Sequence, residues 1–245
     1  MQVEKGPRGF VVKDETGRTV FVGPYQKLTP VRDGEFFIVA NGCSSTGGAR
    51  CTKTGLVDKK GKVRVPLVYD DVLPEDPVVT EDCDEGSDFS GGKIRVKKGA
   101  FVGVFDWTSG REIIAPRRYS AICAFEGKVA RVRIDKGRWA LREDDDAVFH
   151  SVGLWGLVSV TDKELVAPVH GAIGPFAGGV ARFRVHAPCT TRGHASCAHG
   201  RMGLLDTAGR VVLAPEYDAI SPKLADGSRR VLQTGRMGIL RVRQR

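Results

Sequence analysis

A short segment that recurs along the whole chain constrains the fold more than any other feature of the sequence. Each copy opens with a glycine, and successive openings lie 46, 48, 53, 47 and 35 residues apart. These anchor glycines are Gly9, Gly55, Gly103, Gly156, Gly203 and Gly238, of which the first marks a weaker copy. A period near 47 residues is typical of propellers, arrays and solenoids, in which one small unit is repeated. We therefore expect about five similar units.

Each unit is predicted to form four short strands. The segment 203–206 (Gly-Leu-Leu-Asp) predicts an apolar anchor strand, and Gly209 supplies the positive φ of a hairpin turn. The segment 211–215 predicts a return strand that ends at a proline. The segment 217–220 (Tyr-Asp-Ala-Ile) begins a third strand. A fourth strand is typified by 180–185, where apolar and basic residues alternate as they do in half-buried strands.

This strand content predicts an all-β fold. Four strands in about 47 residues is the content of one propeller blade, and five blades would close into a ring. The alternative is an open β-solenoid-like array with capped ends. We favour the propeller-like ring, within a single repeat domain over residues 1–245. Its predicted units are approximately 9–54, 55–102, 103–155, 156–202 and 203–245.

Several stretches contain either a tryptophan next to a glycine-rich turn or strand, or a phenylalanine shortly before a glycine. They are Trp155-Gly156, Gly137-Arg138-Trp139, and the segments 125–130 (Phe-Glu-Gly-Lys-Val-Ala) and 176–181 (Phe-Ala-Gly-Gly-Val-Ala). Together with the Asp-x-x-Gly turns and the Pro-x-x-Tyr-Asp segments, this pattern resembles the WG (KWG) repeat family. The resemblance extends from about residue 9 to residue 240. In other copies the tryptophan position holds Thr54, Val102, Met202 and Met237.

The resemblance implies a repeat fold and a binding role. The WG family is defined by its repeat and carries no known catalytic motif, so the match says more about fold than about activity. The chain also lacks a Gly-x-Ser-x-Gly elbow and a Gly-x4-Gly-Lys-[Ser/Thr] phosphate loop. We therefore predict a protein that is not an enzyme and holds no cofactor. Trp139 and Trp155 occupy the position that should pack between units, so we expect both in the core.

Four inserted segments interrupt the repeat, at 41–53, 74–92, 141–152 and 186–200. Insertions in repeat proteins tend to be loops, and loops carry binding residues. We therefore predict a non-catalytic binding or scaffold module whose loops engage another protein or a cell-envelope polymer.

The net charge of +9 admits a second function, the binding of an anionic polymer such as nucleic acid or an acidic glycan. The candidate binding residues occupy alternate positions of two equivalent strands, and they are Arg131, Arg133, Arg182 and Arg184. Neighbouring units could present them as one basic face. The alternative is that they are simply the solvent side of each strand, since basic chains with well-solvated surfaces are common.

The six cysteines favour disulfides. Cys43 and Cys51 are eight residues apart, and so are Cys189 and Cys197, and each pair lies just ahead of an anchor glycine. Matched spacing at matched positions predicts that each pair closes its own loop, which leaves Cys83 and Cys123 to pair with one another. Disulfides would indicate an oxidising compartment, so we predict a periplasmic or secreted protein.

Zinc is the alternative reading of one cysteine loop. Cys189, His194, Cys197 and His199 offer four nitrogen or sulfur ligands, which would suit a zinc-dependent enzyme. Their spacing is not that of a standard structural zinc site, and the matching loop at Cys43 contains no histidine. We therefore favour disulfides and predict no metal.

The sequence shows no segment suited to crossing or entering a membrane. No apolar run approaches the roughly 18 residues that a spanning helix needs. The first six residues have no apolar stretch of the kind found in signal peptides. We expect no membrane span.

Overall fold

The computed structural model describes residues 1–7, 9–43, 51–73, 83, 90–143, 146–185 and 200–241, with the backbone alone for 73, 90 and 136–152. The chain divides into two compact units. Unit 1 comprises Met1–Pro77 and Gly86–Arg118, and unit 2 comprises Val78–Glu85 and Tyr119–Arg245. The described residues form strands and two short 3-10 turns, η1 (Arg32–Gly34) and η2 (Ser90–Gly92), and include no α-helix.

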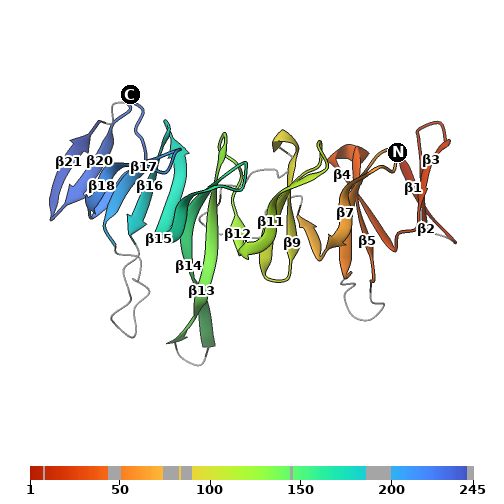
Figure 1. The fold of residues 1–245 in the computed structure, drawn as a ribbon, viewed down its shortest axis with the longest axis horizontal. Coiled ribbons are helices and arrows are strands. Elements are labelled where there is room, and N and C mark those ends of the chain that lie inside the picture. Colours follow the sequence, from red (N-terminus) through yellow and green to blue (C-terminus); the bar gives the residue numbers. More distant parts are fainter. Residues whose placement is uncertain are drawn as a thin grey trace. The chain divides into compact units, whose positions relative to one another are not determined.

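The first part of the chain forms three antiparallel sheets (Figure 1). The first holds three strands, β1 (Gln2–Gly6), β2 (Gly9–Lys13) and β3 (Thr19–Gly23). The second holds four, β4 (Lys27–Val31), β5 (Phe36–Asn41), β6 (Lys53–Asp58) and β7 (Val63–Tyr69). The third also holds four, β8 (Asp71–Leu73), β9 (Lys93–Lys98), β10 (Phe101–Asp106) and β11 (Arg111–Tyr119).

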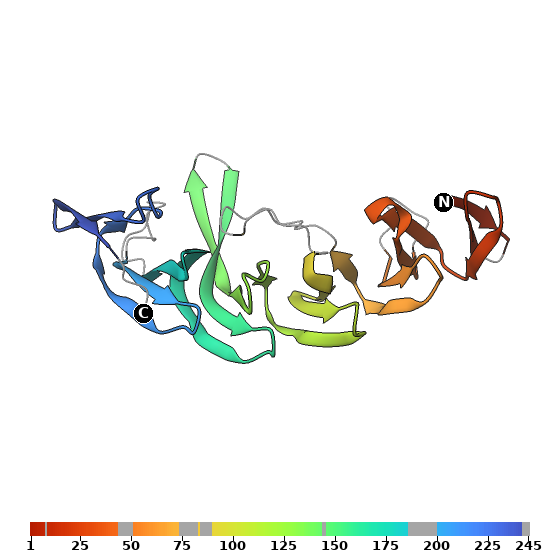
Figure 2. The same cartoon turned by 90° about the horizontal axis from the view of Figure 1, so that it is seen from above.

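The rest of the chain forms two antiparallel sheets. Seven strands make the first, β12 (Ala121–Ile122), β13 (Val129–Glu143), β14 (Asp146–Ser159), β15 (Glu164–Ala177), β16 (Val180–Val185), β17 (Met202–Asp206) and β18 (Val211–Tyr217). Three strands make the second, β19 (Ala219–Ile220), β20 (Arg229–Gln233) and β21 (Arg236–Leu240). The hairpin of β13 and β14 extends beyond the strands beside it (Figure 2).

The sheets repeat one order of strands. In β4–β7 the order is third, fourth, anchor and return strand of the predicted repeat, and β8–β11 follows the same order. In the seven-stranded sheet the return strand of one copy continues as the third strand of the next, within β15. The sheet β4–β7 therefore combines strands of the predicted repeat units 9–54 and 55–102, and the seven-stranded sheet contains strands of three such units.

A close backbone contact explains the anchor glycines. A Cβ on Gly55 would lie 2.6 Å from the carbonyl oxygen of Val65, and one on Gly156 would lie 2.5 Å from that of Val166. The cause is a bulge in the return strand, which uses four residues where the anchor strand uses two: Thr54 pairs with Tyr69, but Leu56 pairs with Val65. Equivalent carbonyls, those of Ile114 and Leu213, cover Gly103 and Gly203.

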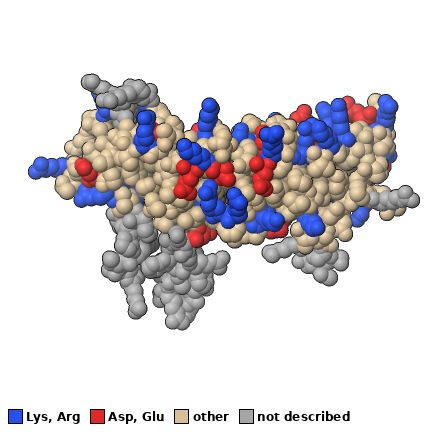
Figure 3. All heavy atoms as spheres, in the orientation of Figure 1, with Lys and Arg blue, Asp and Glu red and all other residues tan. Residues whose placement is uncertain are grey.

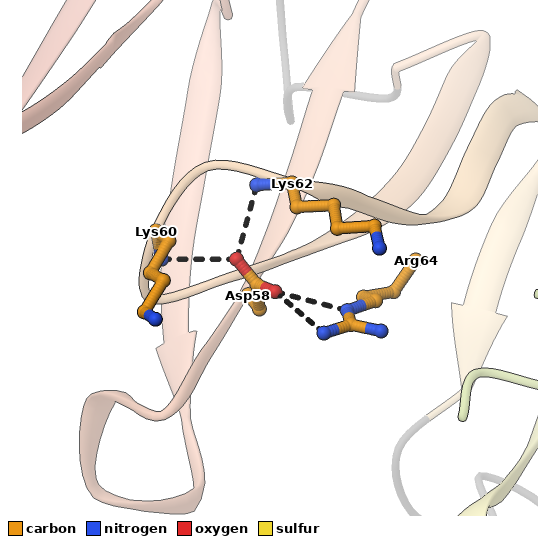
Figure 4. Close-up of polar contacts among 4 residues, drawn as sticks. All are labelled: Asp58, Lys60, Lys62 and Arg64. Atoms are coloured by element: carbon orange, nitrogen blue, oxygen red, sulfur yellow. Dashed lines mark hydrogen bonds and ion pairs between the residues drawn. The ribbon is translucent and has the colours of Figure 1, made fainter.

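The Asp-x-x-Gly turns that begin at Asp14, Asp58 and Asp206 adopt the predicted geometry, with a positive φ at each glycine. At Asp58, one carboxylate oxygen accepts hydrogen bonds from the backbone N–H of Lys60 (2.9 Å) and Lys62 (3.0 Å), and Gly61 has φ 79° (Figure 4). The other carboxylate oxygen accepts a hydrogen bond from Nε of Arg64 at 2.9 Å. The same side-chain-to-backbone turn recurs at Asp14, Ser159 and Asp206. The turn at Asp106 differs, because its carboxylate accepts the backbone N–H groups of Thr108 and Ser109.

The first copy differs from the others at its anchor. Its turn residue is Asp14, and the position three residues earlier, which holds the anchor glycine elsewhere, is Val11. Gly9 lies two residues ahead of that position, at the start of β2, with φ 126°. The glycine in this copy lies at the β1–β2 connection, and a Cβ on it would meet the carbonyl oxygen of Gly23 at the end of β3.

Each unit contains its own apolar cores. In unit 1, Phe37, Val39 and Val57 pack with the first sheet, while Leu56 and Ile94 belong to a second cluster. In unit 2, Trp155 is buried at 3% exposure, which confirms its predicted core position. The side chain of Trp139 lies outside the described part of the chain.

The predicted all-β class is confirmed. Every strand pairing is antiparallel, and each sheet is an open run of strands, so none of the sheets in the described ranges closes into a barrel. Closure of the repeats into a propeller-like ring, as opposed to an open array, stays a prediction.

Candidate functional site

The predicted arginine row lies at equivalent positions of the fourth strands. Arg131 on β13 pairs with Leu157, the residue after the anchor Gly156, and Arg182 on β16 pairs with Leu204 in the same way. Arg95 on β9 occupies this position in unit 1, opposite Val104. The sequence alternation thus identified a real structural register.

The side chains of Arg131 and Arg182 form hydrogen bonds with backbone carbonyl oxygens of the same chain. Arg131 is 2% exposed, and its Nη1 donates a hydrogen bond to the carbonyl oxygen of Ile173 at 3.3 Å. Arg182 donates in the same way to the carbonyl oxygen of Ile220 at 2.9 Å. Ile173 and Ile220 are matching residues in the third strands of the following copies. The two arginines therefore link consecutive copies within unit 2.

Arg133 and Arg184 also have partners within unit 2. The guanidinium of Arg133 donates to one oxygen of Asp135 at 2.9 and 3.0 Å and lies over the Trp155 ring, 6.0 Å from its centroid. Arg184 donates to the carbonyl oxygen of Gly200 at 2.9 Å. A contact of the four arginines with an anionic partner stays a prediction, and the burial of Arg131 leaves the other three as the accessible members of the row.

Exposed basic residues gather at one end of a unit 1 sheet. Lys97 and Lys98 end β9, and Arg117 and Arg118 lie near the end of β11. All four side chains are exposed. Strands β9 and β11 run in the same direction on either side of β10, so both strands finish at the same end of the sheet. On the face drawn in Figure 3, basic side chains are interspersed with acidic ones. On that face the basic side chains therefore do not form one continuous patch.

A hollow of about 300 Å³ lies in unit 2 between the β15–β16 turn and the loop before β20. Its lining residues are Ala177, Gly178, Val180, Lys223, Asp226, Gly227, Arg229 and Arg241. Arg229 is buried and donates hydrogen bonds to the carbonyl oxygens of Ala177 and Ser221, both at 3.2 Å. The hydroxyl and backbone N–H of Ser228 hold the pKa of Asp226 below its usual value. The walls thus carry an excess of positive charge.

Two of the predicted disulfides are present. Cys43 bonds to Cys51 across the first insertion, and Cys83 bonds to Cys123 within the core of unit 2 that contains Trp155. The backbone N–H of Cys43 also donates to Oε1 of Gln26 at 2.7 Å, which ties the base of the loop to the chain ahead of β4.

Several predicted features lie outside the described residues. They are the Cys189–Cys197 pair, His194 and His199 of the zinc alternative, and most of the insertions at 41–53, 74–92 and 186–200. The insertion at 141–152, predicted as a loop, instead continues β13 and β14 as a paired hairpin through residues 141–143 and 146–152. Within the part of the chain that is described, no three His, Cys, Asp or Glu side chains are grouped so as to hold a metal ion. Among the same residues no helix is long and apolar enough to cross a membrane.

Comparisons with known proteins bear on the family. No curated protein sequence matches the chain. One similar solved structure is AztD from Citrobacter koseri, at 9% identity and a TM-score of 0.30, with 96% of this chain and 68% of that chain covered. A TM-score of that size supports no inference about fold or function.

The family model described as the WG containing repeat matches at residues 55–75 and 202–222. Both segments begin at the anchor strand and run through the Asp turn and the return strand, to β8 in one case and β19 in the other. The matched residues are thus the ones whose geometry recurs in β6–β7 and β17–β18, and these two segments of the chain are similar to the WG containing repeat.

Proposed function

We propose that the chain is a non-catalytic binding module, in which the WG-type repeats form a scaffold and the inserted segments engage a protein or polymer partner. The observation that carries the proposal is the internal use of the recurring polar side chains. Turn carboxylates such as Asp58 accept backbone N–H groups, and arginines such as Arg131 and Arg182 bind carbonyl oxygens of the next copy. Recurring residues therefore maintain the fold.

The segments that differ between copies are free to determine specificity. The insertion at 41–53 begins directly after β5 and is closed by the Cys43–Cys51 disulfide. A loop held at its base by a rigid sheet is the usual place for binding residues. Loops of this kind support a role in recognition, with protein surfaces and cell-envelope polymers as the candidate ligand classes.

An immobilised full-length chain tests this function against defined ligands. Peptide, glycan and nucleic-acid arrays would be probed with the wild type and with a variant in which residues 44–50 become a Gly-Ser linker between the intact cysteines. We expect one ligand class to be retained and its binding to weaken in the loop variant at unchanged thermal stability. Retention of no ligand class would overturn the proposal.

We also propose an oxidising compartment, the periplasm or the cell exterior. The two disulfides support it, because such bonds persist mainly outside reducing cytosol. Intact mass after alkylation, with and without reductant, counts the thiols. No alkylated cysteine before reduction and all six after it would establish three disulfides. Two free cysteines together with bound zinc in elemental analysis would favour the zinc alternative.

An anionic polymer is the second candidate partner. The exposed cations Lys97, Lys98 and Arg117 at one sheet edge favour it. Binding through such cations weakens steeply as salt rises, because each neutralised phosphate releases counterions. We expect a linear fall of log K with log salt concentration if this function holds, and a smaller slope in Lys97→Gln/Lys98→Gln. Salt-independent binding would exclude it.

A further inference from the structure

One position of the fourth strand changes its chemistry in β20. In four earlier copies the residue opposite the second residue after the anchor glycine is apolar and buried, as Phe37, Ile94, Ala130 and Ala181. In β20 the same position holds Arg229, which pairs with Leu240. Arg229 is nevertheless only 3% exposed. A guanidinium therefore occupies a place that belongs to the apolar core in the other copies.

The charge of Arg229 has no carboxylate partner among the described residues. Its Nη1 and Nη2 donate to the carbonyl oxygens of Ser221 and Ala177, both at 3.2 Å. A guanidinium has more N–H groups than these two bonds use, and no described residue accepts from the others. Burial and the like charge of Arg182 lower the pKa of Arg229, so its surroundings disfavour the cation. A negative charge placed beside Arg229 would relieve that cost.

The hollow beside Arg229 offers room for such a charge. Its volume of about 300 Å³ is at the lower end of the range for small-molecule sites. Lys223 also lines it, with Nζ 2.8 Å from where a Cβ on Gly178 would lie. Among the described lining residues the one acid is Asp226, whose Oδ1 accepts the backbone N–H and the hydroxyl of Ser228 at 3.0 and 2.6 Å. Asp226 thus serves its own turn, and two cations are left facing the hollow.

The hollow lies within unit 2, between two consecutive copies. Arg229 and Val231 are two residues apart on β20 and so share one face of the strand, and Val231 belongs to the apolar cluster of Leu204 in the preceding sheet. Arg229 also reaches back to Ala177 at the end of β15. The cation site is therefore built from residues 177–180 and 221–229, on the face of β20 that is turned toward the preceding copy.

We propose that this hollow binds a small ligand through one anionic group, a carboxylate or a phosphate. The N–H groups of Arg229 that the two carbonyls do not use donate to oxygens of this group, as arginine does when it recognises carboxylates and phosphates. Lys223 adds a second positive charge at the rim, and the rest of the ligand lies over Ala177 and Val180. This site is distinct from the inserted segments, so the inference goes beyond the proposed function.

Two anions and one neutral molecule serve as probes. D-glucuronate carries a carboxylate, inorganic phosphate carries the alternative group, and D-glucose is a neutral molecule close in size to glucuronate. Each is titrated into the ¹⁵N-labelled full-length protein at constant ionic strength made up with chloride, and backbone amide shifts are followed. We expect saturable shifts at Gly178 and Gly227 with glucuronate or phosphate and none with glucose, and the anion that saturates identifies the group. No saturation by either anion, or equal shifts with glucose, would overturn the inference.

Two variants and a matched control locate the contact. Arg229→Ala introduces the residue found at the matched positions 130 and 181, and it should weaken anion binding at least about tenfold. Lys223→Gln changes an exposed side chain, so the fold is kept even if Arg229→Ala disturbs it, and binding should fall about three- to tenfold. Lys163→Gln, exposed between β14 and β15 and outside the hollow, should leave binding unchanged. Anion binding that survives Lys223→Gln unaltered would contradict the site.

The proposed function fails separately from this inference. The variant in which residues 44–50 become a linker lies in unit 1 and should bind the anion as the wild type does. If an arrayed ligand is retained by the wild type while neither glucuronate nor phosphate saturates, loop-mediated binding holds and the anion site is rejected. If no arrayed ligand is retained but one anion saturates and Lys223→Gln weakens it, the anion site holds and the loop function is rejected.

Discussion

The copies at 55–69 in unit 1 and 156–170 in unit 2 build the same hairpin from different side chains. Both place the anchor glycine beneath a return-strand carbonyl. The turn of the first is held by the Asp58 carboxylate at 2.9 and 3.0 Å, and that of the second by the Ser159 hydroxyl at 3.3 and 3.2 Å. Asp162, with φ 57°, replaces the turn glycine in the second copy. The two copies therefore share the backbone contact at the anchor glycine and differ in the polar groups that hold the turn.

Exchanging the core residue that precedes the anchor glycine should have the largest effect on stability. Unit 1 has Thr54 there, whose hydroxyl donates to the carbonyl oxygen of Asp70 at 3.0 Å, while unit 2 has the buried Trp155. Replacing Trp155→Thr removes a large buried ring and is expected to lower the free energy of unfolding of unit 2 by about 3–5 kcal/mol. Chemical denaturation followed by circular dichroism measures the loss. A cost below about 1 kcal/mol would mean that the ring is not part of the core.

The anchor glycines should respond alike in both copies. Gly55→Ala and Gly156→Ala each place a Cβ against a carbonyl oxygen, so we expect about 1–3 kcal/mol of destabilisation in either unit. Gly6→Ala is the control, because the nearest atoms to its added Cβ lie 3.6 Å away. Unequal effects of the two anchor substitutions, measured by hydrogen exchange in each unit, would break the equivalence of the copies.

Removing the side chain of the turn residue should cost more stability at Asp58 than at Ser159. The mostly buried carboxylate of Asp58 accepts hydrogen bonds from two backbone N–H groups and from the guanidinium of Arg64. Asp58→Ala is therefore expected to lower the free energy of unfolding by about 1–3 kcal/mol. Ser159→Ala removes longer bonds to a neutral hydroxyl and should cost about 0.5–1 kcal/mol. Thermal unfolding of the two variants gives the ranking, and the reverse order would show that turn chemistry does not follow hydrogen-bond charge.

The smallest effect should be a pH dependence confined to the second copy. Burial lowers the pKa of His170, which occupies the position of Tyr69 and packs edge-on to Phe183 at 4.8 Å. Below the ordinary histidine pKa of 6.5 the unfolded chain binds more protons than the folded one, so stability falls as pH drops from about 7.5 through 6.5 toward the lower folded pKa. His170→Tyr should remove this slope. Denaturation midpoints between pH 7.5 and 5.5 measure it, and an unchanged slope in the variant would assign it to another group.

The structure qualifies what could be read from the arginine row. The alternation at 129–133 and 180–185 correctly indicated half-buried strands, because side chains point to opposite faces at a period of two. Alternation alone does not say which face meets another sheet. Arg131 lies on the face covered by the following copy and binds the carbonyl oxygen of Ile173, so its aliphatic stem packs inside the unit. Knowing that required the position of residues 42 places along the chain.

The cysteine prediction succeeded to the extent that it rested on local spacing. Cys43 and Cys51, which close one loop, are only eight residues apart, and so short a separation favours their pairing over pairing with more distant cysteines. Cys83 and Cys123, 40 residues apart, could be paired only by elimination, and the packing of both sulfurs beside Trp155 confirms the pairing.

Local chemistry determined the repeating elements of this protein. Glycine opposite a bulge, aspartate before a turn and a proline in the return strand each act on backbone groups a few residues away, so their spacing was legible in the sequence. The tertiary structure decided which arginines became buried links between copies and which cysteine, 40 residues away, Cys83 bonds to. Those outcomes depend on what packs against a surface from distant parts of the chain, and the short-range pattern of residues does not encode that neighbour.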